Sequence, residues 1–323
     1  MTTLLNEPWD YLIVLDACRF DYFEQMWKDY LPAGGQLKRI ESPGSSTDEW
    51  RDNLFGGFYD NIVYITANPQ INMSMPVYGY CAKEHFKFVH ELWKDSWDSH
   101  WGTVLPESVT RRALEIIAQY PAGMRFVIHY LQPHAPYIHV PYDRPSEFEA
   151  FNRFLLNPNQ PDPSRPVRSL LFGRLLPLFR RLYRRTNQPE WILRKLLWIP
   201  PRGPMEIAWR TLGTAGLKEA YRNNLKAVLE QVRILAQSLP GTLVITSDHG
   251  ELLGEEGQFA HPRGSQHPIL RNVPWLVIKT NTVRCPSEAG PPDQPKGSAA
   301  PQTETVKNED EIIQRLRALG YYD

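Results

Sequence analysis

The chain has 323 residues, of which 42% are hydrophobic and 22% are charged, and its 36 basic side chains balance 36 acidic ones. This length accommodates one large α/β domain or two average domains, and the apolar fraction suffices for a sizeable core. Zero net charge gives no general reason to expect a nucleic-acid partner, and it argues against an acidic, salt-adapted surface.

The cysteines and the N-terminal region bear on whether the protein is cytoplasmic or exported. Cys18, Cys81 and Cys285 lie far apart without a CxxC pair, a pattern that fits a reducing compartment better than a disulfide framework or zinc ribbon. The first predicted strand begins about ten residues in, which leaves no room for a signal peptide, and no apolar run reaches the roughly 20 residues that span a bilayer. We therefore predict a cytoplasmic protein, peripheral to the membrane if it contacts one.

Short apolar strands alternate with amphipathic helices, which predicts an α/β/α sandwich with a largely parallel central sheet. In chain order the predicted elements are a strand at 11–15, helices at 20–28 and 48–54, a strand at 62–66, helices at 84–93 and 107–119, a strand at 126–131, a helix at 217–239, and strands at 243–246 and 275–278. On the long helix, Leu225, Val228, Leu229, Val232 and Leu235 form an apolar stripe that predicts packing on the sheet.

A segment near the C-terminus interrupts this alternation. Residues 285–309 are rich in Pro, Gly, Ser and Thr, which predicts a flexible linker at 286–308. The linker would join a catalytic domain at 1–285 to a C-terminal helix at 309–323.

The second interruption is a basic helical insertion at 151–205. It carries ten Arg and one Lys against Asp162 and Glu190, a local charge of +9, so the remaining chain carries −9. Basic amphipathic helices that contain Trp suit anionic membrane surfaces. A lid packed on the main domain with its arginines toward solvent is an equally weighted alternative, and either arrangement is compatible with gathering an anionic substrate.

Reactive side chains follow three of the predicted strands. Asp16 follows the first strand, His134 follows the strand at 126–131, and Asp248 and His249 follow the next one. Because α/β proteins place active sites at the carboxyl ends of their strands, these side chains are predicted to meet at one edge of the sheet. Alternatively, these side chains form turns or cap helices, as Asp and His after a strand often do.

The loop at 42–50 is rich in hydroxyl groups. Ser46 and Glu49 have capping-box spacing, which predicts a helix that begins at about Thr47 and directs its free N–H groups and positive end at the loop. Such a loop is either an anion site that contains nucleophiles or a plain helix cap. The spacing does not separate Ser45, Ser46 and Thr47 as nucleophile.

Taken together, the ordered motifs resemble a known family. They are Asp16 after a strand, the hydroxyl loop, His134-Ala135-Pro136-Tyr137 and Ser247-Asp248-His249-Gly250-Glu251. This order resembles the alkaline phosphatase superfamily, specifically its sulfatase-like and lipoteichoic-acid-synthase-like branches. The resemblance extends to 220–224 and 315–321, and it implies an alkaline phosphatase-like fold.

For the metal, the resemblance implies a divalent ion held by Asp16, Asp248 and His249, with the oxygen of the nucleophile completing the site. Carboxylates and imidazoles suit Zn²⁺ or Mn²⁺ better than Ca²⁺, which prefers all-oxygen shells. Zn²⁺ or Mn²⁺ is therefore the predicted cofactor, with Ca²⁺ and Mg²⁺ as alternatives.

For the nucleophile, the resemblance favours Thr47, since aligning it with the threonine of the family leaves Trp50 near the usual following aromatic residue. Thr47 would then also be a metal ligand, and Ser46 is the next candidate. The implied activity is a metal-dependent hydrolase or transferase of phosphate mono- or diesters with a covalent Thr or Ser intermediate.

Two histidines receive roles from the same resemblance. His134 would contact the transferring group or the leaving oxygen, and His261 would be a second anion contact or a ligand of a second metal. The position where two-metal relatives carry Asp is Gln132, a poor ligand, which favours one tightly bound ion. His129, in mid-strand, is predicted to be a core histidine.

A sulfatase and a catalytically silent binding protein are the two alternatives to an enzyme that acts on phosphate esters. The chain lacks the Cys-x-Pro-x-Arg sequence that sulfatases convert to formylglycine, and Cys18 is predicted to be a small buried thiol. A sulfatase with unusual nucleophile chemistry and a catalytically silent binder of anionic glycans or lipids therefore rank below the phosphoryl-transfer reading. The predicted partner is an anionic phosphate or sulfate ester that is sugar- or lipid-linked.

Overall fold

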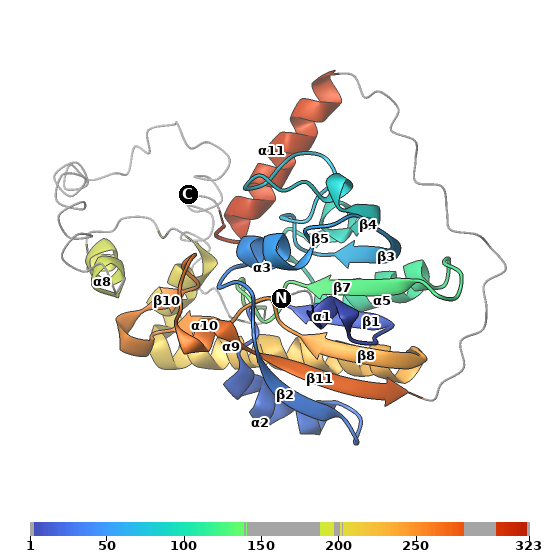
Figure 1. Ribbon diagram of the computed structural model, residues 1–323. Helices are drawn as coiled ribbons and strands as arrows, with labels where there is room; N and C mark the ends of the chain where they lie inside the picture. Colours follow the sequence, from blue (N-terminus) through green and yellow to red (C-terminus); the bar gives the residue numbers. More distant parts are fainter. Residues whose placement is uncertain are drawn as a thin grey trace.

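The computed structural model describes residues 3–138, 140, 188–196, 201, 203–280 and 302–321. A seven-stranded sheet forms the centre and has helices on both faces (Figure 1). The strands stand in the order β2, β11, β8, β1, β7, β3, β4. Their bounds are β1 Tyr11–Leu15, β2 Gln36–Glu41, β3 Tyr59–Thr66, β4 Phe86–Glu91, β7 Arg125–Tyr130, β8 Gly241–Thr246 and β11 Asn272–Thr280.

The sheet is parallel except at β11. Strand β1 pairs in parallel with β7 on one side and β8 on the other, and β3 pairs in parallel with β7 and β4. Strand β11 runs antiparallel to both β8 and β2. The predicted sandwich with a largely parallel sheet is confirmed, and the carboxyl ends of β7, β1 and β8 lie side by side at one edge.

The two faces of β1 show why its sequence is an unbroken apolar run. Ile13 and Leu15 join one core with side chains of the helices α2, α5 and α9, whereas Leu12 and Val14 join a second core with side chains of α1 and α3. Successive strand residues point to opposite faces, so a strand covered on both sides needs apolar residues throughout. The helix bounds are α1 Thr3–Asn6, α2 Phe20–Tyr30, α3 Thr47–Leu54, α5 Pro106–Ile117 and α9 Pro204–Ser238.

The remaining elements of the described chain follow here in chain order. They are η1 Ala82–Glu84, α4 Leu92–Asp95, β5 Trp97–Asp98, β6 Thr103–Val104, α8 Gln188–Leu196, β9 Leu252–Leu253, η2 Glu255–Gly257, β10 Phe259–Ala260, α10 Pro268–Arg271 and α11 Gln302–Ala318.

The helix predicted at 84–93 is wrong. This segment forms the end of η1, then β4, and then the start of α4. In β4, Phe86 and Phe88 are buried while Lys87 between them is exposed, an alternation typical of a strand. Strand β2 was not predicted, because it lies at the edge of the sheet and its side chains are exposed or only partly buried.

The long helix α9 begins at Pro204 instead of 217 and is kinked at Gly213. Residues 204 and 205, at the end of the predicted insertion, therefore belong to this helix. The apolar stripe predicted between 225 and 235 is buried, which confirms it as the packing face.

Part of the basic insertion is described and packs on the main domain. Trp191 of α8 is buried and stacks on Phe259 with ring centroids 4.5 Å apart. Arg194 is also buried and pairs with Glu206 of α9 at 3.2 Å. These contacts agree with the lid alternative for this helix, while the stretch at 167–185 lies outside the described residues.

The terminal helix α11 starts at Gln302, before the predicted position 309, and residues 286–301 of the predicted linker lie outside the described ones. Ile312, Leu316 and Leu319 are buried in the core that also contains side chains of α5 and α9. This docking brings the chain end back toward the sheet (Figure 1).

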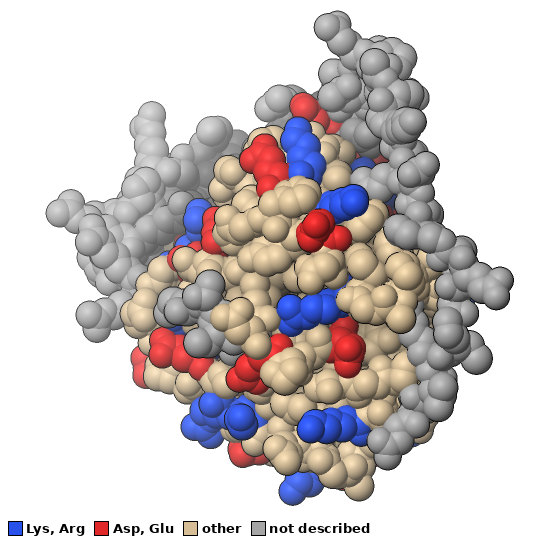
Figure 2. Space-filling model, turned by 45° about the vertical axis from the view of Figure 1, so that its right-hand side comes forward, with Lys and Arg blue, Asp and Glu red and all other residues tan. Residues whose placement is uncertain are grey.

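The surface of the described residues is mixed in charge. Figure 2 shows basic and acidic side chains interspersed over the face in view. Within the described part of the chain, none of the helices combines the length and apolar character that crossing a membrane requires.

Candidate active site

Asp16, Asp248 and His249 meet at the carboxyl ends of β1 and β8. All three side chains are buried, and their ligand atoms lie within 4.8 Å of one another. His249 Nε2 is 3.4 Å from Asp248 Oδ2 and 3.9 Å from Asp16 Oδ1. The structure thus brings together the residues that the sequence predicted at one sheet edge.

Thr47 adds a hydroxyl to this group. It is the first residue of α3, and its Oγ1 donates to Asp248 Oδ2 at 2.7 Å and lies 3.3 Å from His249 Nε2. Thr47 is buried. A hydroxyl, two carboxylates and an imidazole therefore converge beside a helix N-terminus, the positive end of the helix dipole.

The other two hydroxyls of the loop bond elsewhere. The helix begins at Thr47 as predicted, but the predicted capping box does not form. The Ser46 hydroxyl donates to Asp48 Oδ1 at 2.6 Å, and it makes no hydrogen bond that caps the helix. Glu49 Oε2 accepts from the backbone N–H and the hydroxyl of Ser45, both at 2.9 Å. The reason is that the carboxylate of Asp48 offers Ser46 a charged acceptor, and charge-assisted bonds are the stronger ones.

Local hydrogen bonds fix the ligand atoms of the loop after β8. Asp248 Oδ1 accepts from the backbone N–H groups of Ala17 at 3.0 Å and His249 at 2.9 Å, which leaves Oδ2 for Thr47. His249 Nδ1 lies 2.8 Å from the carbonyl oxygen of Gly250. A proton on Nδ1 makes Nε2 the acceptor, and Nε2 faces the other ligand atoms.

Gly250 is required by a close approach of two backbones. Its N–H donates to the carbonyl of Leu270 at 2.9 Å, and a Cβ at this position would lie 1.9 Å from the carbonyl oxygen of Ile269. The glycine after Asp-His thus lets the ligand loop lie against α10.

Asp16 has one satisfied oxygen and one open one. Its Oδ2 accepts from Asn68 Nδ2 at 2.7 Å and from the Tyr321 hydroxyl at 2.9 Å. Its Oδ1 is buried and has no hydrogen-bond partner among the described residues. Burial raises the pKa of Asp16 well above its ordinary value, and the neighbouring Asp248 raises it further.

The donor set fits a divalent cation. Burying two adjacent carboxylates is costly unless a cation compensates them, and no Lys or Arg of the described residues forms an ion pair with Asp16 or Asp248. The open oxygen of Asp16, Asp248 Oδ2 and His249 Nε2 supply the mixed oxygen and nitrogen ligands that suit Zn²⁺ or Mn²⁺.

A second group lies beside the first. The ligand atoms of His134, Glu251 and His261 are also within 4.8 Å of one another. His261 Nδ1 is 3.0 Å from Glu251 Oε1, and the ring centroids of His261 and His249 are 4.3 Å apart. Burial raises the pKa of Glu251 to about 7 and lowers those of His134 and His261 to about 4.

Glu251 was missed as a site residue, although it ends the motif that drew attention to Asp248 and His249. Its Oε2 is buried without a hydrogen-bond partner in the described part of the chain and lies 3.9 Å from His134 Nε2. Its place in the motif, two residues after His249, was the available signal.

The hydrogen bonds of Gln132 and His129 go to residues outside the two groups. The amide of Gln132 donates to Thr103 Oγ1 and to the carbonyl of Val104, both at 3.2 Å, so it bonds to β6 and not to the ligand group. His129 is buried, with Nδ1 3.0 Å from the Tyr64 hydroxyl and Nε2 4.0 Å from Asp16 Oδ2, so it lies beside the candidate metal site.

Helix α9 braces two of the site loops. The Tyr221 hydroxyl accepts from the Arg19 N–H at 2.8 Å and donates to the Ala17 carbonyl at 2.7 Å. Three residues along, Asn224 Nδ2 donates to the carbonyl of His134 at 3.1 Å. Residues three apart share a helix face, so one face of α9 holds the loops of Asp16 and His134 in fixed relation.

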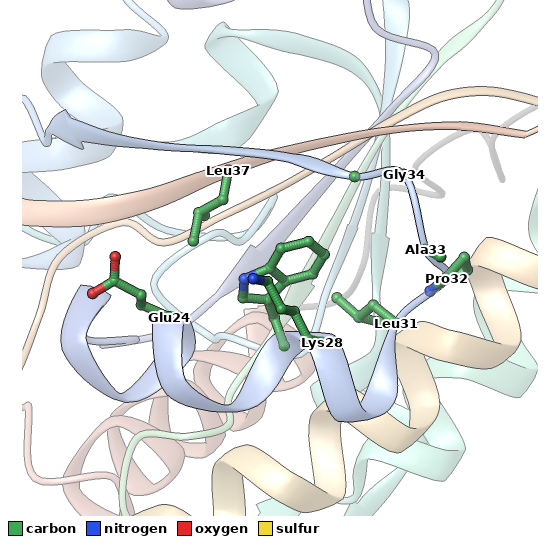
Figure 3. A pocket seen from close by; sticks show the side chains of 9 residues that line it. Glu24, Lys28, Leu31, Pro32, Ala33, Gly34 and Leu37 are labelled. Atoms are coloured by element: carbon green, nitrogen blue, oxygen red, sulfur yellow. The ribbon is translucent and has the colours of Figure 1, made fainter.

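A cavity of about 660 Å³ lies away from this site, between α2 and β2. Figure 3 shows Glu24 and Lys28 on the helix and Leu37 on the facing strand. Its lining contains none of the residues of the two groups.

No family model and no curated protein matches the chain, but solved structures resemble it. The soluble domain of lipooligosaccharide phosphoethanolamine transferase A from Neisseria meningitidis is 14% identical, with a TM-score of 0.48 over 82% of this chain and 75% of that one. The integral membrane form of this transferase is 13% identical, with a TM-score of 0.46 over 83% of this chain and 46% of that one. The chain therefore spans less than half the length of the membrane protein.

A phosphonate monoester hydrolase of Agrobacterium radiobacter is 12% identical, with a TM-score of 0.45 over 84% of this chain and 68% of that one. At such low identity the likeness concerns the fold alone, and we base the function on the geometry of the site.

Proposed function

We propose that the chain is a metal-dependent enzyme of the alkaline phosphatase superfamily that hydrolyses or transfers phosphate mono- or diesters, with Thr47 as nucleophile. The observation that carries this proposal is the environment of Thr47 Oγ1, 2.7 Å from Asp248 Oδ2 and 3.3 Å from His249 Nε2. A divalent ion held by Asp248 Oδ2 and His249 Nε2 would lie beside this hydroxyl and make it more acidic, and a helix N-terminus favours an anionic substrate.

Asp16, Thr47, Asp248 and His249 would hold the metal. When bound, a divalent ion supplies positive charge against the phosphate and makes a coordinated hydroxyl more acidic. Zn²⁺ or Mn²⁺ is the ion that we propose for this mixed donor set.

The remaining steps fall to the residues of the chain. Thr47 Oγ1 attacks phosphorus and forms an O–P bond while the bond from phosphorus to the leaving oxygen breaks. The hydroxyl proton passes through water to the leaving oxygen, because Asp248 Oδ2 is occupied as a metal ligand. His134 and His261, whose ring centroids are 5.1 Å apart, border the site and contact the transferring group. Water or the hydroxyl of an acceptor then attacks the phosphorus, and the bond to Thr47 Oγ1 breaks. The enzyme is a hydrolase if water is the acceptor and a transferase if a second hydroxyl is.

A phosphate ester is preferred over a sulfate ester because of the nucleophile. Formylglycine arises from Cys or Ser, and the residue bonded to Asp248 Oδ2 is Thr47. A sulfatase remains the second enzyme candidate. A silent binder of anionic glycans or lipids ranks third, since the ligand set and the hydroxyl are both intact.

The proposal is tested by metal analysis with turnover of an aryl phosphate, an aryl phosphodiester and an aryl sulfate. We expect bound metal and metal-dependent turnover of at least one phosphate ester. Preference for the sulfate would restore the sulfatase, and absence of both metal and turnover would favour the silent binder. Thr47→Ala and Ser46→Ala form a matched pair, of which only the first should abolish turnover.

A peripheral membrane contact through 151–205 is a further part of the proposal. Ile192 and Leu196 of α8 are exposed apolar side chains, and several arginines of the segment lie outside the described residues. Replacing Arg180, Arg181, Arg184 and Arg185 by Gln should weaken sedimentation with anionic vesicles but preserve turnover of a small ester. Equal binding to anionic and neutral vesicles by both proteins would reject this contact. The cytoplasmic location also stays a prediction.

A further inference from the structure

Tyr321, beyond the end of α11, reaches into the candidate metal site. Its hydroxyl donates to Asp16 Oδ2 at 2.9 Å across 305 positions of sequence. Asn68 donates to the same oxygen at 2.7 Å, so two donors hold Oδ2 while Oδ1 has none among the described residues. The two hydrogen bonds fix which oxygen of Asp16 stays open.

The ring of the same tyrosine contacts the second group. It stacks on His134 with centroids 5.0 Å apart and planes 20° apart, and it lies 5.9 Å from the ring of His261. Tyr321 is therefore a bridge, with its hydroxyl on a candidate metal ligand and its ring on a histidine that borders the substrate.

The turn that ends α11 is built to place this side chain. Gly320 has a φ of 86°, and its N–H donates to the carbonyl of Arg317 at 2.9 Å. The N–H of Tyr321 donates to the carbonyl of Leu316, also at 2.9 Å. These are the two bonds of a Schellman motif, which glycine in the left-handed region favours.

Further contacts anchor both ends of the turn. Leu316 and Leu319 are buried in the core, and the Tyr78 hydroxyl donates to the carbonyl oxygen of Tyr321. A chain end that only covered the surface would need neither the capping motif nor a bond to a buried carboxylate.

We propose that Tyr321 is a positioning residue that presents Asp16 to the metal through one oxygen and holds the ring of His134. This inference rests on the metal-dependent function proposed above. Hydrogen bonds to a ligating carboxylate orient it, and loss of such a partner typically costs about 10- to 100-fold in metal affinity or activity. Without the phenol, only Asn68 holds Oδ2, and the carboxylate is free to turn.

The variants separate the hydroxyl from the ring. Tyr321→Phe keeps the ring and removes the hydroxyl, whereas Tyr321→Leu removes both. Tyr120→Phe is the matched control, because it removes a phenol hydroxyl whose partner, His90 Nε2 at 2.9 Å, lies outside the site.

The first measurement is the Zn²⁺ dissociation constant of the metal-free full chain, obtained by competition with a chromophoric chelator. We expect Tyr321→Phe to bind Zn²⁺ about 10- to 100-fold more weakly than wild type and Tyr120→Phe to bind it equally well. Wild-type affinity in Tyr321→Phe would overturn this inference alone. Failure of the wild type to bind Zn²⁺ would overturn the proposed function and this inference with it.

The second measurement is kcat at saturating metal. A role in presenting Asp16 predicts that excess Zn²⁺ restores kcat in Tyr321→Phe, which a merely structural defect would not allow. Tyr321→Leu should stay impaired because His134 has lost its stacking partner. Equal kcat in the two variants at saturating metal would refute the role of the ring.

Discussion

The hydroxyl of Ser42 donates to the backbone carbonyl oxygen of Asp248, 206 positions away. The same oxygen of Ser42 accepts from the N–H of Gly44 at 3.2 Å. One serine thus ties the loop that leads to Thr47 to the loop of the ligand pair. The hydroxyl proposed as nucleophile and the proposed metal ligands are thus held together by the protein itself.

Because of this hydrogen bond, we expect Ser42→Ala to lower kcat without weakening metal binding. Asp248 Oδ1 keeps its two backbone donors, so metal affinity should stay near wild type. Thr47 loses its alignment, and small misplacements cost up to about 100-fold in rate. Steady-state kinetics should therefore show a fall in kcat. Ser96→Ala is the control, because the Ser96 hydroxyl donates to Asp95 outside the site. Unchanged kcat would show that the tie is dispensable.

Removing a ligand should abolish metal binding without unfolding the protein. Asp248→Asn eliminates one of two adjacent buried carboxylates, and unpaired buried charge destabilises the fold. We expect no bound metal by elemental analysis, no turnover, and a thermal midpoint of the metal-free variant equal to or above that of the metal-free wild type. Retention of metal by Asp248→Asn would remove Asp248 from the ligand set.

Gly250→Ala should damage stability and site together. The added Cβ would meet the carbonyl oxygen of Ile269 at 1.9 Å, so the ligand loop or α10 must move. Forced overpacking costs roughly 1–3 kcal/mol, which urea unfolding would measure. Gly56→Ala is the control, since the atom nearest to an added Cβ there, the Asp52 carbonyl oxygen, would be 3.9 Å away. Equal stability of the two variants would contradict the close approach.

His90 lies outside the candidate site, and its lowered pKa should make the stability of the fold depend on pH. Burial lowers its pKa to about 4, and nearby Arg112 contributes. An unfolded histidine titrates near pH 6.5, so below that pH the unfolded chain binds the proton and the folded chain does not. Stability from neutral His90 is thus present above about pH 6.5 and is lost as the pH falls toward about 4.

His90→Gln removes this contribution. The loss in free energy of unfolding between about pH 7 and pH 5 should be smaller than in wild type by roughly 1–2 kcal/mol. Urea titrations at the two pH values measure both losses. Identical losses in the two proteins would mean that His90 takes up a proton in the folded state.

The sequence predicted the features that are recorded in one short stretch of residues. The run at 11–15 is apolar because both faces of β1 are covered, and Asp16 follows it at the sheet edge. The alternation of Phe86, Lys87 and Phe88 also held a strand signal, but the interpretation as a helix missed it. Strand β2 carried no comparable signal, because an exposed edge strand does not need apolar residues.

Site residues that act through distant contacts escaped prediction. Asn68 and Tyr321 reach Asp16 across 52 and 305 positions. Tyr321 ends the stretch 315–321 that the resemblance covers, but neither this Tyr nor an isolated Asn has a spacing that indicates a contact with Asp16. Glu251 stood in one motif with Asp248 and His249 and could have been found from it. Long-range partners of a ligand become visible only when the fold brings their elements together.

A phosphorylated intermediate on Thr47 gives the most direct test. The enzyme is mixed with an aryl phosphate ester, quenched in acid during turnover, digested, and examined by peptide mass spectrometry. We predict a phosphoryl group on Thr47, unmodified Cys18, Ser45 and Ser46, and no phosphopeptide from Thr47→Ala or Asp248→Asn. A phosphoryl group on Ser45 or Ser46, an aldehyde in place of Cys18 or either serine, or full turnover by Thr47→Ala would contradict Thr47 as the nucleophile.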